Sequence, residues 1–105
     1  MSSEEFSAPN ADVLEQTRVK EPRRYQVLLH NDDYTTMEFV VAVLMEIFHK
    51  DEEQATAIML SVHKKGIGVA GVYPREIAET KIAQVRERAA KYGFPLRCSL
   101  REEGA

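Results

Sequence analysis

Residues 25–48, YQVLLHNDDYTTMEFVVAVLMEIF, contain the pattern that decides the fold. Residues 25–29 are apolar and partly β-branched, as strands are. Beyond a polar loop, apolar residues recur every three or four positions, which is typical of a helix buried along one face. The members of this stripe are Met37, Val40, Val41, Leu44, Ile47 and Phe48. The stretch therefore predicts a strand, a loop and an amphipathic helix.

The loop carries more acceptor side chains than a helix start needs. Thr35 and Glu38 have the spacing of a capping box, so we expect the helix to begin directly after Thr35. Asn31, Asp32 and Asp33 remain unexplained. Adjacent carboxylates repel each other unless water or a cation lies between them. The loop therefore predicts either an ordinary acidic turn or a site for a positively charged group.

The second half of the chain predicts two more helices and two more strands. Asp51 and Gln54 form a second capping-box pattern, and Gly66 suits the end of that helix. Residues 67–73 are small, β-branched and broken by glycines, as in a strand that lies close to another backbone. Pro74 opens a third helix, and residues 96–101 alternate as a last strand. The helix residues expected to face the core are Ala55, Ile58, Met59, Val62, Ala78, Ile82, Val85, Ala89 and Tyr92.

The predicted fold class is α+β. The order β-α-α-β-α-β gives a small two-layer sandwich, in which a three-stranded, mainly antiparallel sheet packs against three helices. The length of 105 residues suits one domain, which we place at residues 25–102. Residues 1–24 have two prolines and no sustained apolar period, so they predict a disordered N-terminal arm.

Composition excludes several classes of protein. The net charge is −3 and the basic residues are scattered, so the chain lacks the electrostatic footprint of a nucleic-acid binder. Neither a membrane-spanning run nor an export leader is visible, and we expect a cytoplasmic protein. Cys98 alternates with Leu96 and Leu100, which predicts a buried thiol rather than a disulfide or zinc ligand.

His63 shares one side of the second predicted helix with Met59 and Val62. Its ordinary interpretation is a histidine at the edge of the core, bonded to a backbone carbonyl. No nucleophile elbow, zinc-protease motif or glycine-rich phosphate loop is present in the sequence. We therefore predict neither an enzyme nor a bound cofactor or metal.

Four motifs, in order, resemble the ClpS family, the bacterial N-degron (N-end rule) adaptors. They are N-D-D-Y-T-x-M-E-F at 31–39, M-L-x-V-H at 59–63, G-V-Y at 71–73 and A-E-T-K at 78–81. The similarity extends over residues 25–101, with Thr36 and Ala70 where the family often has proline and cysteine. It implies an adaptor that binds an N-terminal Leu, Phe, Tyr or Trp of a substrate. It also implies delivery of that substrate to the ClpA unfoldase and ClpP protease.

The resemblance also implies residue roles. Asn31, Asp33 and His63 would bind the substrate's α-amino group, with Asp32 supporting them at the rim. The first side chain would be surrounded by Thr35, Met37, Met59, Val62 and Leu96. Glu76 and Lys81 would dock on the N-terminal domain of the ATPase, and the flexible arm would serve delivery. We expect a monomer without cofactor.

Two other classes of function stay open from the sequence. One is a divalent-cation-dependent enzyme using Asp32, Asp33 and His63, in which a chelator would abolish peptide binding. The other is a structural interaction domain resembling the C-terminal domains of the ribosomal stalk, in which replacing His63 would change no peptide binding because none exists. The adaptor hypothesis predicts that a Leu-first peptide binds and its N-acetylated form does not.

Overall fold

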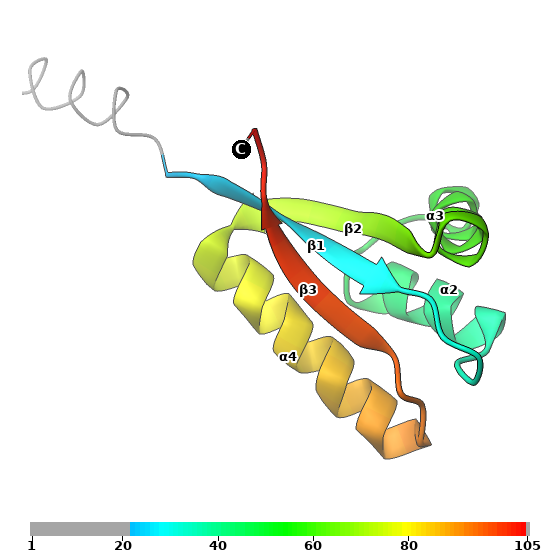
Figure 1. The fold of residues 1–105 in the computed structure, drawn as a ribbon. Helices are drawn as coiled ribbons and strands as arrows, with labels where there is room; N and C mark the ends of the chain where they lie inside the picture. The colour runs from blue at the N-terminus through cyan, green and yellow to red at the C-terminus, as the bar shows by residue number, and fades with distance from the viewer. Residues whose placement is uncertain (1–21, 105) are drawn as a thin grey trace, which may run out of the picture.

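A computed structural model of the chain describes residues 22–104 (Figure 1). Its elements are β1 (Arg24–His30), α2 (Met37–Glu46), α3 (Glu52–Lys65), β2 (Ile67–Pro74), α4 (Arg75–Tyr92) and β3 (Arg97–Glu102). The predicted order and the α+β class are confirmed. Most of the predicted arm, residues 1–21, lies outside the described residues.

The sheet is antiparallel throughout, with strand order β2-β1-β3, as predicted. The register of β1 with β2 shifts between Val27 and Leu28. Val27 pairs with Gly71 and Leu28 with Val69, which leaves Ala70 unpaired as a bulge. At this bulge Ala70 is fully buried in the core. This is the position at which the ClpS family often has cysteine.

The helices supply the second layer, and α4 runs along the sheet as its longest element (Figure 1). The strands give Val27, Leu29, Ala70 and Cys98 to the core, so Cys98 is buried as predicted. The buried helix residues are Val40, Val43, Leu44, Ala55, Val62, Ala78, Ile82, Val85 and Ala89. Ile58 and Met59 are partly buried against them. Tyr92 was predicted to face inward but is 58% exposed; it is the last residue of α4, and its ring lies 5.8 Å from that of Phe39.

The structure corrects the predicted start of the first helix. Thr36, not Thr35, occupies the N-cap of α2, where its hydroxyl accepts the backbone N–H of Phe39. Thr35 instead donates to Asp32 in the preceding loop. Because Phe39 lies three residues after the cap, Glu38 cannot complete a capping box. Thr36 thus supplies a cap at the position where the family often has proline.

The other helix ends largely follow the sequence. Asp51 accepts the Gln54 N–H, and Gln54 Oε1 accepts the Asp51 N–H, so the predicted capping box is present at α3. Gly66 ends α3 with a φ of 86°, in the left-handed region that glycine adopts readily. Pro74 was predicted inside the first turn of α4 but is its N-cap residue. Within residues 22–104, no helix has the length and apolar character needed to cross a bilayer.

Lys81 of α4 stabilises the C-terminal end of α2. Its Nζ donates to the Ile47 carbonyl oxygen over 2.7 Å and lies 5.6 Å from the centre of the Tyr73 ring. α2 has no basic residue of its own in its last turn. A cation near the carbonyl end of a helix is stabilising, and a charged hydrogen bond strengthens the contact.

Replacing Lys81 should therefore weaken the fold. We expect Lys81→Met to lower the free energy of unfolding by about 1–2 kcal/mol, because the Ile47 carbonyl loses its charged donor while the aliphatic stem is retained. Urea unfolding followed by circular dichroism measures the difference. Arg86→Met removes a charge from an exposed position in the middle of the same helix and is the control. Equal stability of the two variants would contradict a capping role for Lys81.

Candidate functional site: an apolar cavity with an acceptor-lined mouth

The polar loop after β1 lies next to the C-terminal end of α3. His30, the last residue of β1, pairs with Ile67, the first residue of β2. The next residue, Asn31, donates its backbone N–H to the Gly66 carbonyl over 3.0 Å. His63 lies in the last turn of α3, three residues before Gly66. Strand pairing therefore brings two motifs together that are about thirty positions apart in the sequence.

These segments enclose a cavity of about 260 Å³. Its lining combines polar side chains of the loop and of His63 with apolar side chains of α2 and α3. The lining residues are Asn31, Asp32, Asp33, Thr35, Met37, Val40, Met59, Val62 and His63. All the residues that the sequence suggested for the α-amino group lie here, together with four of the five suggested for the hydrophobic pocket.

Leu96 is the predicted pocket residue that does not line this cavity. It is 5% exposed and belongs to the core cluster. It immediately precedes β3, which pairs with β1 on the edge opposite β2, whereas α3 packs against β2. Val40 lines the cavity although sequence reasoning gave it only a core role. Its position three residues after Met37, on the same helix face, was the signal that could have placed it there.

Asp32 holds the loop in shape by accepting three hydrogen bonds from within it. Its Oδ1 accepts the backbone N–H groups of Tyr34 and Thr35 over 2.8 and 2.7 Å, and its Oδ2 accepts the Thr35 hydroxyl over 2.7 Å. Burial alone would raise the pKa of Asp32, but the hydrogen bonds from Thr35 and Tyr34 outweigh it, so the net pKa is lowered from 3.8. Asp32 is therefore an ionised residue that fixes the loop's shape.

Asn31, Asp33 and His63 are the exposed polar members of the lining. Within residues 22–104 their side chains make no hydrogen bond or ion pair of their own, unlike Asp32. His63 is thus not the core-edge histidine of the ordinary interpretation. An amide oxygen, a carboxylate and an imidazole nitrogen can all accept hydrogen bonds from one donor group at the cavity mouth.

The apolar part of the cavity depends on close packing of α3 against β2. Val62 is 3% exposed and Val40 6%, whereas Met37 at the mouth is 43% exposed. A Cβ atom on Gly68 would lie 2.7 Å from Val62 Cγ2 and 3.4 Å from the Ile58 carbonyl oxygen. Glycine at this position lets the strand approach the helix and seats Val62 in the cavity wall.

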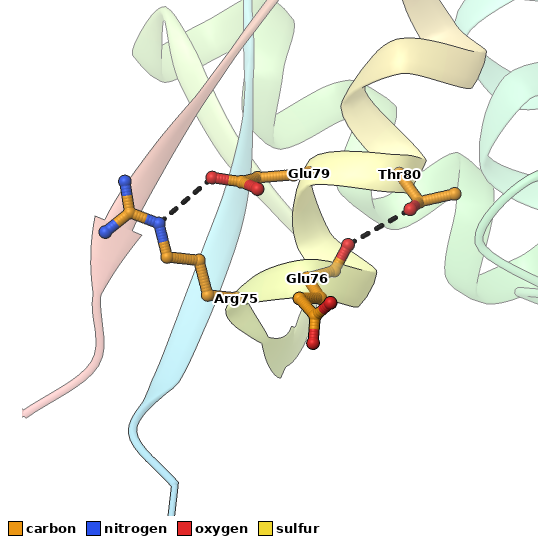
Figure 2. Close-up of polar contacts among 4 residues, drawn as sticks. All are labelled: Arg75, Glu76, Glu79 and Thr80. Carbon is orange, nitrogen blue, oxygen red and sulfur yellow. Dashed lines mark hydrogen bonds and ion pairs between the residues drawn. The ribbon is translucent and has the colours of Figure 1, made fainter.

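The residues suggested for partner docking, Glu76 and Lys81, lie on α4, and neither lines the cavity. Glu76 is exposed in the first turn, and its backbone carbonyl accepts the Thr80 hydroxyl over 3.0 Å. Beside it, Arg75 Nε donates to Glu79 Oε2 over 3.0 Å. Figure 2 shows the Glu76 carboxylate directed away from this ion pair. Lys81, one turn further on, is half-buried against Ile47.

A cavity with apolar walls and a mouth lined by hydrogen-bond acceptors defines a binding domain for a ligand that is apolar at one end and a donor at the other. The model of the family described as ATP-dependent Clp protease adaptor protein ClpS matches residues 20–99. The chain belongs to the ClpS family. It is therefore an adaptor of Clp protease and not an enzyme, which excludes the cation-dependent enzyme and the ribosomal-stalk interpretation.

Individual relatives are similar over most of the chain. The ATP-dependent Clp protease adapter protein ClpS of Oleidesulfovibrio alaskensis is 67% identical, covering 89% of each chain. The ClpS of Lawsonia intracellularis is 64% identical over 87% of this chain and 84% of its own. Among solved structures, Agrobacterium tumefaciens ClpS2 bound to L-phenylalaninamide is similar with a TM-score of 0.76 and 38% identity, covering 79% of this chain and all of that one.

Proposed function

We propose that this chain binds the N-terminal residue of substrate proteins when it is Leu, Phe, Tyr or Trp, and that recognition requires a free α-amino group. The protein works as a monomer in the cytoplasm and delivers its substrates to a ClpA-type unfoldase with ClpP. The observation that carries the proposal is one cavity that combines apolar walls with three acceptors, which have no hydrogen-bond partner within residues 22–104. The similar ClpS2, bound to the amide of an apolar amino acid, supports it.

The α-amino group of a peptide suits the mouth of the cavity. With a pKa of about 7.7 to 8.0 it is mostly an ammonium ion at neutral pH and offers three donors. Asn31, Asp33 and His63 supply three acceptors there. A hydrogen bond involving a charged group contributes roughly 1.5–3 kcal/mol. The three acceptors therefore recognise the free α-amino group, whatever the side chain of the first residue is.

The apolar walls then select among first residues. Burying a Leu or Phe side chain contributes roughly 1.5–3 kcal/mol. Met37 and Met59 are flexible and can adapt to unbranched or aromatic groups, whereas a branch at Cβ would lie against Met37 and Thr35 at the mouth. Both contributions together give a micromolar or somewhat tighter complex after the cost of ordering the peptide.

Delivery uses a different surface. We propose that Glu76 and Lys81 contact the N-terminal domain of the unfoldase, and that residues 1–24 serve the transfer of the substrate. One N–H of the Lys81 ammonium donates to the Ile47 carbonyl, which leaves two N–H groups for a partner. Glu76 is fully available as the exposed carboxylate of the pair.

A fluorescence anisotropy panel of short peptides that differ only in the first residue tests the proposal. We expect Leu-, Phe-, Tyr- and Trp-first peptides to bind, and Val- and Ile-first peptides to bind at least about tenfold more weakly, a difference of roughly 1.4 kcal/mol. A panel in which valine binds as well as leucine would contradict selection by the cavity mouth. Met45→Val changes an exposed methionine outside the cavity and should leave the ranking unchanged.

Asp32 should matter although its carboxylate oxygens are already occupied. We expect Asp32→Ala to weaken binding of the Leu-first peptide by about 10-fold, because the Tyr34 and Thr35 donors lose their acceptor and the loop no longer presents Asn31 and Asp33 in one geometry. Anisotropy measures the change. Asp51→Ala removes a carboxylate with comparable backbone contacts at the start of α3, outside the cavity, and is the matched control.

The same residue sets a pH dependence. Because the folded-state pKa of Asp32 lies below its ordinary value of 3.8, the ionised form is present throughout the neutral and mildly acidic range. Its contribution to stability is complete above the unfolded-state pKa and is lost as the pH falls through the folded-state pKa. The Asp32 variant should therefore lose less stability than the unaltered chain on acidification below about pH 4.

A further inference from the structure

One face of the sheet points away from the helices and the core. The core-facing residues of β1 and β3 are Val27, Leu29, Cys98 and Leu100, so the intervening residues point to the opposite side. By strand register this open face consists of Arg24, Gln26, Leu28, His30, Ile67, Val69, Val72, Pro74, Arg97, Ser99 and Arg101. These eleven positions include three arginines, and within residues 22–104 the one acidic neighbour in register is Glu103, which lies opposite Arg24 just beyond β3.

Side-chain contacts across this face agree with the register. Arg101 Nε donates to Gln26 Oε1 over 2.7 Å, and His30 Nε2 lies 2.7 Å from Ser99 Oγ. Arg97 is the partner of His30 in the β1–β3 register, and burial and then the charge of Arg97 lower the pKa of His30. Leu28 is buried at 5% beneath these neighbours although it lies outside the core cluster. The face is therefore partly apolar with arginines at its margin.

The excess of negative charge in the chain lies before Pro22. Residues 1–21 contain five acidic and two basic side chains, so they account for the entire net charge of −3, and the remainder is formally neutral. The segment joins the described chain next to Arg24, which belongs to the open face. Arg24 itself is only loosely paired, at 3.9 Å from Glu103, and its side chain is 58% exposed.

Length permits contact between the two. Twenty-one residues can span roughly 70 Å when extended, whereas β1 is only about 23 Å long. Tethering gives such a segment an effective concentration on the order of millimolar at the surface beside its attachment point. A weak electrostatic attraction is then enough to populate a bound state, and it should be sensitive to salt.

We propose that the acidic residues of segment 1–21 bind the open face of the sheet, with Arg97 and Arg101 as their principal partners. The occupant is this chain's own N-terminal segment, and an acidic segment of another protein would compete for the same arginines. The inference does not depend on the proposed function, because none of the residues of this face lines the cavity.

Paramagnetic relaxation measured on the ¹⁵N-labelled full-length chain tests the inference. A nitroxide on Ser7→Cys labels the segment selectively, because Cys98 is buried and burial raises the pKa of its thiol to about 12. At low salt we expect the amide signals of Ser99 and Leu28 to lose at least about half of their intensity. The amides of Glu52 and Thr56, at the start of α3, should keep theirs.

Two comparisons determine the outcome. Raising the salt to about 0.5 M, and the double variant Arg97→Gln/Arg101→Gln, should each restore the Ser99 signal, whereas Arg86→Gln, an exposed arginine on α4, should not. Broadening that is equal over strands and helices would overturn the proposal. So would broadening at β3 that persists in both high salt and the double variant. Neither result would bear on peptide binding, which anisotropy measures separately.

Discussion

A peptide that begins with leucine should bind, and the same peptide with an acetylated N-terminus should bind at least about 100-fold more weakly. Acetylation removes the positive charge and two of the three donors that, in the proposed complex, would bind Asn31, Asp33 and His63. Two lost charged hydrogen bonds at roughly 1.5–3 kcal/mol each correspond to more than a hundredfold change. Anisotropy with a label at the peptide's C-terminus measures both affinities.

The effect should depend on His63. Replacing it with alanine removes one acceptor, so His63→Ala should bind the free peptide about tenfold more weakly and reduce its advantage over the acetylated form. His49→Ala is the matched control, since His49 is also exposed but does not line the cavity. Comparable affinities for the free and acetylated peptides would remove the basis for recognition of the α-amino group.

Gly68→Ala should destabilise the fold by about 2–3 kcal/mol. The added Cβ would lie 2.7 Å from Val62 Cγ2, closer than carbon atoms can pack, and α3 or β2 must shift to relieve the overlap. Because Val62 and His63 are neighbours on α3, the same shift would move the cavity wall and an acceptor away from Asn31. Urea unfolding measures the stability, and anisotropy measures the accompanying loss of affinity.

A second substitution separates this packing effect from a change in strand propensity. Val62→Ala removes the clashing methyl group, so the double variant Gly68→Ala/Val62→Ala should be more stable than the sum of the two single effects predicts. Gly66→Ala is a useful contrast: its Cβ would meet nothing within 4 Å, but its φ of 86° disfavours a side chain. Strict additivity of the Gly68 and Val62 effects would contradict a direct contact between them.

The loop shows where sequence reasoning succeeds and where it does not. Adjacent hydroxyls at Thr35 and Thr36 are equally able to cap a helix, and the Glu38 spacing favoured the wrong one. The choice depends on Asp32, whose carboxylate takes both the N–H and the hydroxyl of Thr35 and leaves Thr36 to cap α2. Both contacts span three residues, so spacing alone does not choose between the two threonines, and the geometry of the loop decides which of them caps α2.

Among the predicted features, the cavity residues came from the resemblance to the ClpS family. The sequence by itself determined the element order, the α+β class and the capping box of α3. These follow from periodicity and local hydrogen bonding, which act over a few residues. Only the tertiary structure decided that Leu96 belongs to the core and Val40 to the cavity, and that Lys81 caps α2. Those outcomes depend on strand order and on contacts between distant segments, which no local pattern encodes.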